Sequence, residues 1–242
     1  MTEPTAEDIV LYDDVTALGE ELWTISKKIE GLNNDPKMFS ILLFRRLRSN
    51  HQGYTLLWKN RLDLEADIVL RSAIESSICI AANSKLGSDF VSLMLEDTAS
   101  TIKGQITVQN SHFGGNSVKF ANDTLKSIAA HITTDTKPKK LNWAELAKHG
   151  GVDLLYGFHK MLSAGSSHVT GISILRGVTG AGLGADLRSL EAIERNVHLS
   201  IMAWTTLIGV KVHAGIIGER AIVDRANALE ARMDVLSRST QA

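Results

Sequence analysis

The chain has 242 residues, of which 44% are hydrophobic and 22% charged, a balance typical of soluble globular proteins. Its formal net charge of −1 counts against a dedicated duplex-DNA-binding protein and against electrostatic attachment to an anionic membrane. The single cysteine, Cys79, excludes a disulfide framework within the chain. We therefore expect a soluble cytoplasmic protein with no membrane partner.

Apolar residues recur at three- and four-residue steps almost throughout the chain, which predicts helices. Thr5 and Asp8 have the spacing of a helix start, and that first helix is expected to stop near Gly31. Asp35 and Pro36 then open a second helix as N-cap and first helical residue. We expect Gly53 to separate it from one long helix over residues 54–86.

The second half of the chain continues the helical pattern. Ser88 is expected to cap a helix that runs to residue 113, and a further helix covers 118–132. Asn142 caps a short helix over 143–149, and an apolar helix starts at residue 152. The glycine-rich stretch 176–187 predicts a flexible loop, before a last helical pair that breaks near 215–218. The prediction is an all-α bundle of roughly seven to nine helices, without a sheet, in one domain over residues 1–242.

Residues 219–238 form the last predicted helix, which is charged and amphipathic. Its apolar positions are Ile222, Leu229, Met233 and Leu236. A peripheral helix of this kind often packs on a partner copy, so we expect a homo-oligomer.

Two charged residues stand on an otherwise apolar stripe of the predicted 54–86 helix. Arg71 and Glu75 are four residues apart and can pair, while Leu64, Ile68 and Ile78 share their face. Burying such charges is costly unless they are partnered, so they either order the core or line a site. Earlier turns extend a similar stripe through Tyr54, Trp58, Arg61 and Glu65.

An apolar helix gives way to small polar residues at "MLSAGSSHVTG", residues 161–171. In one interpretation, Ser163 and His168 satisfy carbonyl groups at the helix end. In the other, His168 acts as general acid or base, with Arg71 stabilising an anion and Glu75 orienting a partner. Ser163, Ser166 or Ser167 would then be a nucleophile, although the Gly-x-Ser-x-Gly elbow is missing. We predict that Arg71, Glu75 and His168 lie together.

The segments "LRSAIESSICIAA" and "NWAELAKHGGVDLLYGFHKMLSAGSSHVTG" resemble a bacterial all-helical family catalogued as a domain of unknown function. The resemblance covers roughly residues 44–172, and its motifs are Arg-x3-Glu and Ser-x4-His. The matching positions are Arg71, Glu75, Ser163 and His168. His159 stands where the pattern has a second tyrosine. The resemblance implies a shared polar site and supplies no activity.

A second, weaker resemblance is to the HEPN ribonucleases, which are helical proteins of bacterial toxin and antiphage systems. It rests on Arg46 and His51, whose Arg-x4-His spacing matches that family. The resemblance implies RNA cleavage without a metal, and an RNA or nucleotide partner. The same residues also suit a plain helix end.

Two further patterns were weighed for cofactors and metals. Glu191, Glu194 and His198 share one helix face, but they lack the second Glu-x-x-His copy of a di-iron bundle. Glycines 180, 182 and 184 lack the Gly-Lys-Ser/Thr sequence of a phosphate loop. We expect no metal and no cofactor.

Two hypotheses remain open from the sequence. The first is a bacterial cytoplasmic helical protein with a polar interhelical site at Arg71, Glu75 and His168, acting as a metal-independent nuclease-like or antiphage-defence component. The second is a non-catalytic interaction module in which the same cluster fixes helix register. The site of an enzyme should open into a concave pocket, whereas a cluster that only fixes helix register should be closed to solvent.

Overall fold

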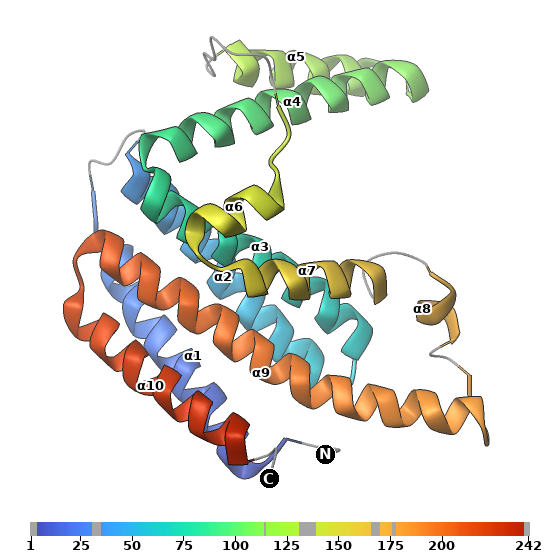
Figure 1. Cartoon of the computed structure of the whole chain (residues 1–242). Helices are drawn as coiled ribbons and strands as arrows, with labels where there is room; N and C mark the ends of the chain where they lie inside the picture. The colour runs from blue at the N-terminus through green and yellow to red at the C-terminus, as the bar shows by residue number, and fades with distance from the viewer. Residues whose placement is uncertain are drawn as a thin grey trace.

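The computed structural model describes residues 4–30, 35–113, 115–130, 139–165, 170–175 and 178–239. Within these ranges the chain forms ten helices and no strand, which confirms the all-α prediction (Figure 1). The number exceeds the predicted seven to nine because the five-residue α8 was not expected. The helices are α1 (Ala6–Ser26), α2 (Pro36–Lys59), α3 (Asp63–Leu86), α4 (Ser88–His112), α5 (Asn116–Ala130), α6 (Trp143–Gly150), α7 (Asp153–Gly165), α8 (Gly171–Leu175), α9 (Leu183–Ile217) and α10 (Arg220–Ser239).

The core is built around α3 and α9, which pack on each other and on α2. Ile74 and Ile78 of α3 and Val210 of α9 are completely buried. Helix α6 packs on α3 at Gly150, where a Cβ atom would lie 3.0 Å from the backbone nitrogen of Ala82. The α4–α5 hairpin projects away from this body, whereas α1, α9 and α10 lie side by side at its opposite end (Figure 1).

Two buried histidines tie α1, α2 and α9 together. The ring nitrogens of His51 in α2 are hydrogen-bonded to the hydroxyls of Thr16 (2.7 Å) and Thr206 (2.8 Å). His213 in α9 bonds two serine hydroxyls of α1 and α2 at 2.9 and 2.7 Å. Burial lowers the pKa of His51 to about 4 and that of His213 to about 3, so both rings stay neutral at pH 7.

The expected long helix over 54–86 was wrong, because the chain turns at residues 60–62. Helix α2 continues through Gly53 to Lys59, and α3 begins only at Asp63. Arg61 between them adopts φ = 60°, the one left-handed non-glycine residue in the described part of the chain. This conformation breaks the helix and reverses the chain, so that α2 and α3 pack as neighbours.

Helix α9 begins earlier than expected and absorbs part of the glycine-rich stretch. It starts at Leu183, after Gly182 in a left-handed conformation (φ = 62°), so the predicted loop over 176–187 was too long. By length and composition α9 could span a membrane, but 56% of its most apolar window is buried inside the protein. The core helix of a soluble protein passes the same test, and the fold is compatible with a soluble protein.

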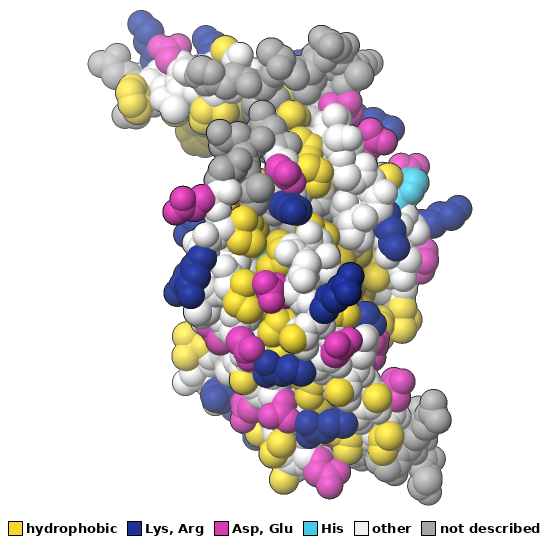
Figure 2. Space-filling model, turned by 90° about the vertical axis from the view of Figure 1, so that its left-hand side faces the viewer, with side chains coloured by type: hydrophobic (Ala, Val, Ile, Leu, Met, Phe, Trp, Pro, Cys, Tyr) yellow, Lys and Arg dark blue, Asp and Glu magenta, His cyan; other side chains and the backbone are white. Residues whose placement is uncertain are grey.

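Helix α10 directs its apolar positions into its own chain. Ile222 is buried, and Leu229 and Met233 pack against the core. Ion pairs fasten the helix at its edges, including Arg225 to Glu21 at 2.7 Å. On the left-hand side of Figure 1, acidic, basic and apolar side chains are interspersed (Figure 2). The homo-oligomer stays a prediction, although the apolar stripe that suggested it is used within the monomer.

Candidate functional site

Helix α3 carries four charged residues at four-residue intervals. Asp63, Asp67, Arg71 and Glu75 follow one another along nearly the same face of the helix. The first two bond with α9, and the last two bond with α7. This ladder of four charged residues therefore divides into two clusters, one at the α3–α9 contact and one at the α3–α7 contact.

The α3–α7 cluster brings together three of the four predicted site residues. Arg71 Nη2 lies 3.1 Å from Glu75 Oε1, and Arg71 Nε donates a 2.8 Å hydrogen bond to Ser163 Oγ. Ser163 in turn donates to the backbone carbonyl of His159 at 2.7 Å. The hydroxyl of Ser163 is thus occupied on both sides, as acceptor from Arg71 and as donor to a backbone carbonyl, and among the described residues no base accepts its hydrogen.

The histidine that meets Glu75 is His159. Its Nε2 lies 3.0 Å from Glu75 Oε1, and its ring packs between Trp143 of α6 and Tyr156 of α7. The predicted partner His168, together with Ser166 and Ser167, lies outside the described residues. His159 was missed because it was treated only as a departure from a family pattern. Its position four residues before Ser163, on the same helix face, was the available signal.

The α3–α7 cluster is only partly exposed to solvent. The side chains of Arg71, Glu75 and His159 are 28%, 18% and 6% exposed, and His159 Nδ1 is buried without a hydrogen-bond partner among the described residues. Such a cluster fixes the register of α3 against α7, because displacing either helix would strand a buried charge. The geometry of the cluster therefore fits residues that fix helix register better than it fits an open substrate pocket.

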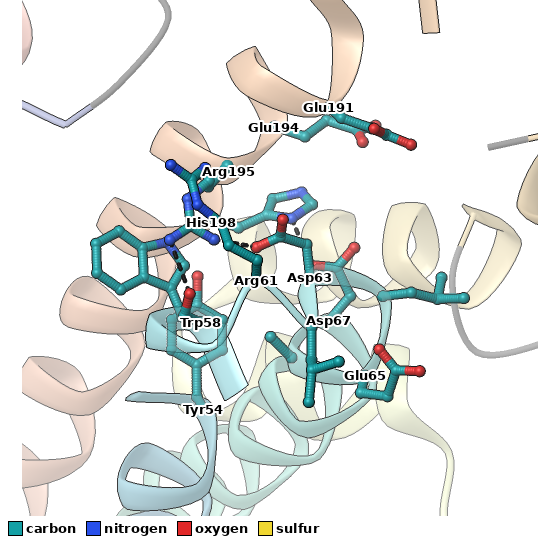
Figure 3. Close-up of a pocket in the computed structure, with 13 residues that line it drawn as sticks. Tyr54, Trp58, Arg61, Asp63, Glu65, Asp67, Glu191, Glu194, Arg195 and His198 are labelled. Carbon is teal, nitrogen blue, oxygen red and sulfur yellow. Dashed lines mark hydrogen bonds and ion pairs between the residues drawn. The ribbon is translucent and has the colours of Figure 1, made fainter. Parts of the chain in front are cut away.

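A cavity of about 210 Å³ lies at the other end of the ladder, where the α2–α3 turn faces α9 (Figure 3). Tyr54, Trp58 and Arg61 were expected on one continuous helix, whereas the break at residue 61 folds them around this space. The cavity is lined by Tyr54, Trp58, Arg61, Leu62, Asp63, Leu64, Glu65, Ala66, Asp67, Glu191, Glu194, Arg195 and His198.

Arg195 anchors α9 to the α2–α3 turn. Its guanidinium group forms an ion pair with Asp63 and donates a 2.7 Å hydrogen bond to the carbonyl oxygen of Trp58. The same group stacks over the indole ring of Trp58 at 4.1 Å from the centroid. These contacts neutralise the charge of Arg195 and hold one wall of the cavity in place.

His198 and Asp67 form a buried pair in the cavity wall. Nδ1 of His198 lies 2.6 Å from Asp67 Oδ1, and the two residues are only 8% and 3% exposed. With Asp67 ionised, this bond places the ring hydrogen on Nδ1 and leaves a lone pair on Nε2. Nε2 has no hydrogen-bond partner among the described residues, and the ring lies between Asp67 and the two glutamates of α9 (Figure 3).

Tyr54 closes the floor of the cavity as a neutral phenol. Its side chain is completely buried, and burial raises its pKa well above the usual value. The hydroxyl of Tyr54 therefore acts as a hydrogen-bonding group and not as a phenolate base. Among the described residues of this wall, the groups with the chemistry of a general base are His198 and the carboxylates.

The predicted Arg46–His51 pair does not converge. His51 is buried, with both ring nitrogens occupied by threonine hydroxyls. The exposed Arg46 lies on another face of α2 and donates a hydrogen bond to Ser72 of α3. Glu191, Glu194 and His198 share a face, as expected, and they line the cavity. The described residues contain no group of three or more ligand-type side chains arranged to hold a metal ion.

Comparison with known proteins gives a family and no activity. Residues 37–180 match the model of a family described as "Family of unknown function (DUF5677)". This match begins in α2 and ends before α9, so it contains Arg71, Glu75 and Asp67 but not His198. No curated protein and no solved structure matches the chain.

Proposed function

The chain belongs to the DUF5677 family, and we propose that it is an enzyme that performs acid–base chemistry on a compact substrate in the α2–α3/α9 cavity. In this proposal His198 is the proton acceptor through Nε2, and Asp67 is the positioning residue that fixes its tautomer. The observation that carries the proposal is the 2.6 Å bond between them, which leaves the opposite nitrogen directed into a cavity.

The pair has the features that general-base catalysis requires. A base must lie within hydrogen-bond reach of the proton that it removes, so it must face a space large enough for a substrate or a water molecule. When Nε2 takes up that proton, the ring becomes an imidazolium whose Nδ1–H still donates to Asp67, and the carboxylate stabilises the new charge. Low solvent exposure strengthens this interaction.

The reaction uses residues other than those predicted from the sequence. In this proposal Arg71, Glu75 and Ser163 have a structural role, because they bond to one another and to α7 with limited exposure to solvent. The nuclease-like role in antiphage defence stays a prediction, and the carboxylates around His198 disfavour an RNA phosphate there. A cytoplasmic location is part of the proposal, because the chain has a single cysteine and therefore no disulfide within it.

The second candidate function is the non-catalytic interaction module. It is favoured by the ion-paired α3–α7 cluster and by the packing of α1, α2, α9 and α10 on one another, which the buried His51 and His213 reinforce. In that case the α2–α3/α9 cavity would be a packing defect, and substitution of its polar residues would change stability alone.

An untargeted activity screen distinguishes the two functions. Purified protein is incubated with pools of low-mass metabolites and with a labelled RNA, in the presence of a chelator, and consumption is followed by mass spectrometry. The same reactions are run with His198→Gln and with His149→Gln, which alters an exposed histidine on α6. Conversion by the wild type and His149→Gln but not by His198→Gln supports the proposal. No conversion by the wild type, or equal conversion by His198→Gln, contradicts it.

A further inference from the structure

We infer that the α4–α5 hairpin is an interaction surface whose partner is the same surface of a second copy of this chain. The surface is separate from the α2–α3/α9 cavity, and the pairing does not depend on the proposed function. The hairpin projects away from the helical body, and α5 packs on α4 without another extensive helix contact in the described part of the chain (Figure 1). Four large apolar side chains of the hairpin are exposed to solvent, namely Val108, Phe113, Phe120 and Ile128.

Three of these exposed side chains, Val108, Phe113 and Phe120, line a groove of about 830 Å³ between α4 and α5. On α4, Thr101, Gly104 and Val108 follow one another at three- and four-residue steps and so share one face of the helix. A Cβ atom added at Gly104 would have no atom of a neighbouring element within 4 Å, so the groove is open above this residue. A groove of this form accepts the side chains of a facing helix.

The charged side chains of the two helices lie away from the groove. With about 3.6 residues per turn, Lys103 lies on the side of α4 opposite to the groove. Lys119, Asp123 and Lys126 likewise face away from the groove on α5. Lys140 is the one charged residue among the described residues that line the groove. The groove therefore offers almost no charge with which to select a charged partner helix.

An almost uncharged face is complementary to its own copy. When two copies of one surface meet, each charge opposes a like charge, and here the lysines of α4 and α5 stay on the outer sides. In a symmetric pair both copies use the same patch, so the exposed apolar side chains of one can enter the groove of the other. Two paired hairpins form a four-helix bundle, in which Gly104 and Ala121 allow close approach. This surface differs from α10, whose apolar positions are used within the monomer.

The size of the face fits a reversible dimer. A helix with the 15 residues of α5 is about 22 Å long, and two helices side by side are about 20 Å wide. Pairing two such faces removes on the order of 1,000 Å² of surface from water, which is where specific interfaces begin. Because the interface is at this lower limit, we expect a dissociation constant in the micromolar range.

Sedimentation velocity of the full-length chain from about 1 to about 200 µM tests the inference. The wild type should pass from monomer to dimer in this range. Sodium chloride at about 0.5 M should leave the dissociation constant within a factor of about two, because no ion pair holds the interface.

The variant Gly104→Arg should weaken dimerisation by about tenfold or more, since it fills the groove and places like charges on both faces. The monomer has room for this side chain, and arginine favours a helix more than glycine does, so the variant should fold. Gly157→Arg is the matched control, because Gly157 is an exposed glycine inside α7 with equally open surroundings. It should dimerise as the wild type does.

Phe120→Ser, on the other helix of the hairpin, gives a second measurement that does not depend on the folding of Gly104→Arg. Phe120 is 75% exposed, so its replacement leaves the monomer core intact while it weakens the dimer. A wild type that stays monomeric up to about 200 µM overturns the inference and leaves the groove to a helix of another protein. Unchanged dimerisation in either folded groove variant, or equal weakening by Gly157→Arg, places the interface elsewhere. Dissociation by salt shows a charged interface and also overturns the inference.

Discussion

The two ends of the row of charged residues on helix α3, Asp63 to Glu75, carry the same pair of chemical groups and use them differently. At one end Asp67 holds His198 at 2.6 Å, and at the other Glu75 holds His159 at 3.0 Å. His159 is enclosed by Trp143 and Tyr156, whereas His198 borders a cavity of about 210 Å³. A carboxylate–histidine pair by itself therefore does not identify a site. What separates the two is the space next to the second ring nitrogen.

That space exists because the chain turns between α2 and α3. The turn at Arg61 brings Trp58 against Arg195 of α9 and leaves the first turns of α3 open on one side. Farther along α3, helices α6 and α7 cover the same face. We therefore expect substitutions in the Asp67–His198 pair to affect chemistry and substitutions in the Glu75–His159 cluster to affect stability.

The largest expected difference is in turnover of the substrate found by the activity screen. Asp67→Asn removes the acceptor that fixes the His198 tautomer and stabilises its protonated ring, so turnover should fall by about 10²-fold or more. The pH dependence of turnover should change as well, which a purely structural residue would not cause. Glu75→Gln, the matched change in the α3–α7 cluster, should leave turnover within a factor of about two, because Glu75 does not line the cavity. Equal losses in the two variants would contradict the distinction.

The dependence of stability on pH provides a second contrast. His51 and His213 are bonded to hydroxyl groups, whereas His159 and His198 are bonded to carboxylates. The folded-state pKa values of His51 and His213 are about 4 and about 3, below about 6.5 for an unfolded chain. Between these values the unfolded state binds more protons, so stability is complete above pH 6.5 and falls as the pH drops through that window. For His51 the full loss is about 3 kcal/mol.

Urea unfolding at pH 7.5, 6, 5 and 4 measures this loss, with variant His51→Gln as the test. This variant starts from lower stability, and its slope against pH should be shallower than that of the wild type. His149→Gln alters an exposed ring and should keep the wild-type slope. An unchanged slope in His51→Gln would show that the ring is not buried in neutral form.

The variant Arg71→Ala should lower the stability of the protein, because Arg71 joins α3 to α7. The change removes the 3.1 Å ion pair with Glu75 and the 2.8 Å bond to Ser163, while Glu75 keeps His159 and some contact with water. We expect a cost of about 1–3 kcal/mol in the free energy of unfolding. Arg46→Ala, on the exposed face of α2, should cost less than about 0.5 kcal/mol. A similar cost in both variants would mean that the cluster does not fix the α3–α7 contact.

The smallest expected effect is at the turn that opens the cavity. Glycine adopts φ = 60° without the steric penalty that Arg61 has, so Arg61→Gly should stabilise the protein by about 0.5 kcal/mol after the entropy of the unfolded glycine is included. Thermal unfolding measures the change, with Lys59→Gly, inside the last turn of α2, as a control that should destabilise. Destabilisation by Arg61→Gly would show that the side chain, rather than the backbone, holds the turn.

Local signals in the sequence were sufficient for most helix boundaries. The capping box of Thr5 and Asp8, the Asp35–Pro36 start, and the Asn142 cap all occur as expected, because each depends on residues two or three positions apart. Ser88 was expected as a cap but lies inside α4, which follows a left-handed Gly87. The break at Arg61 has no comparable local signal, and contacts from α9, more than a hundred residues away, accompany it.

The candidate site was only partly predictable for the same reason. Arg71 and Glu75 are one helical turn apart, so their pairing follows from spacing. The partners of Glu75 and Asp67 come from α7 and α9, and spacing along the chain cannot choose between His159 and another histidine. Glu191, Glu194 and His198 were recognised as one face, but only the fold shows that this face lines a cavity.

The most direct test compares two matched variants, His198→Gln and His159→Gln, for turnover of the same substrate per mole of folded protein. Circular dichroism and the melting temperature establish the folded fraction of each. The account predicts that His198→Gln loses turnover by about 10²-fold or more, whereas His159→Gln keeps turnover and melts at a lower temperature. Retention of turnover by His198→Gln, or an equal loss in His159→Gln, would contradict the assignment of the site to the α2–α3/α9 cavity.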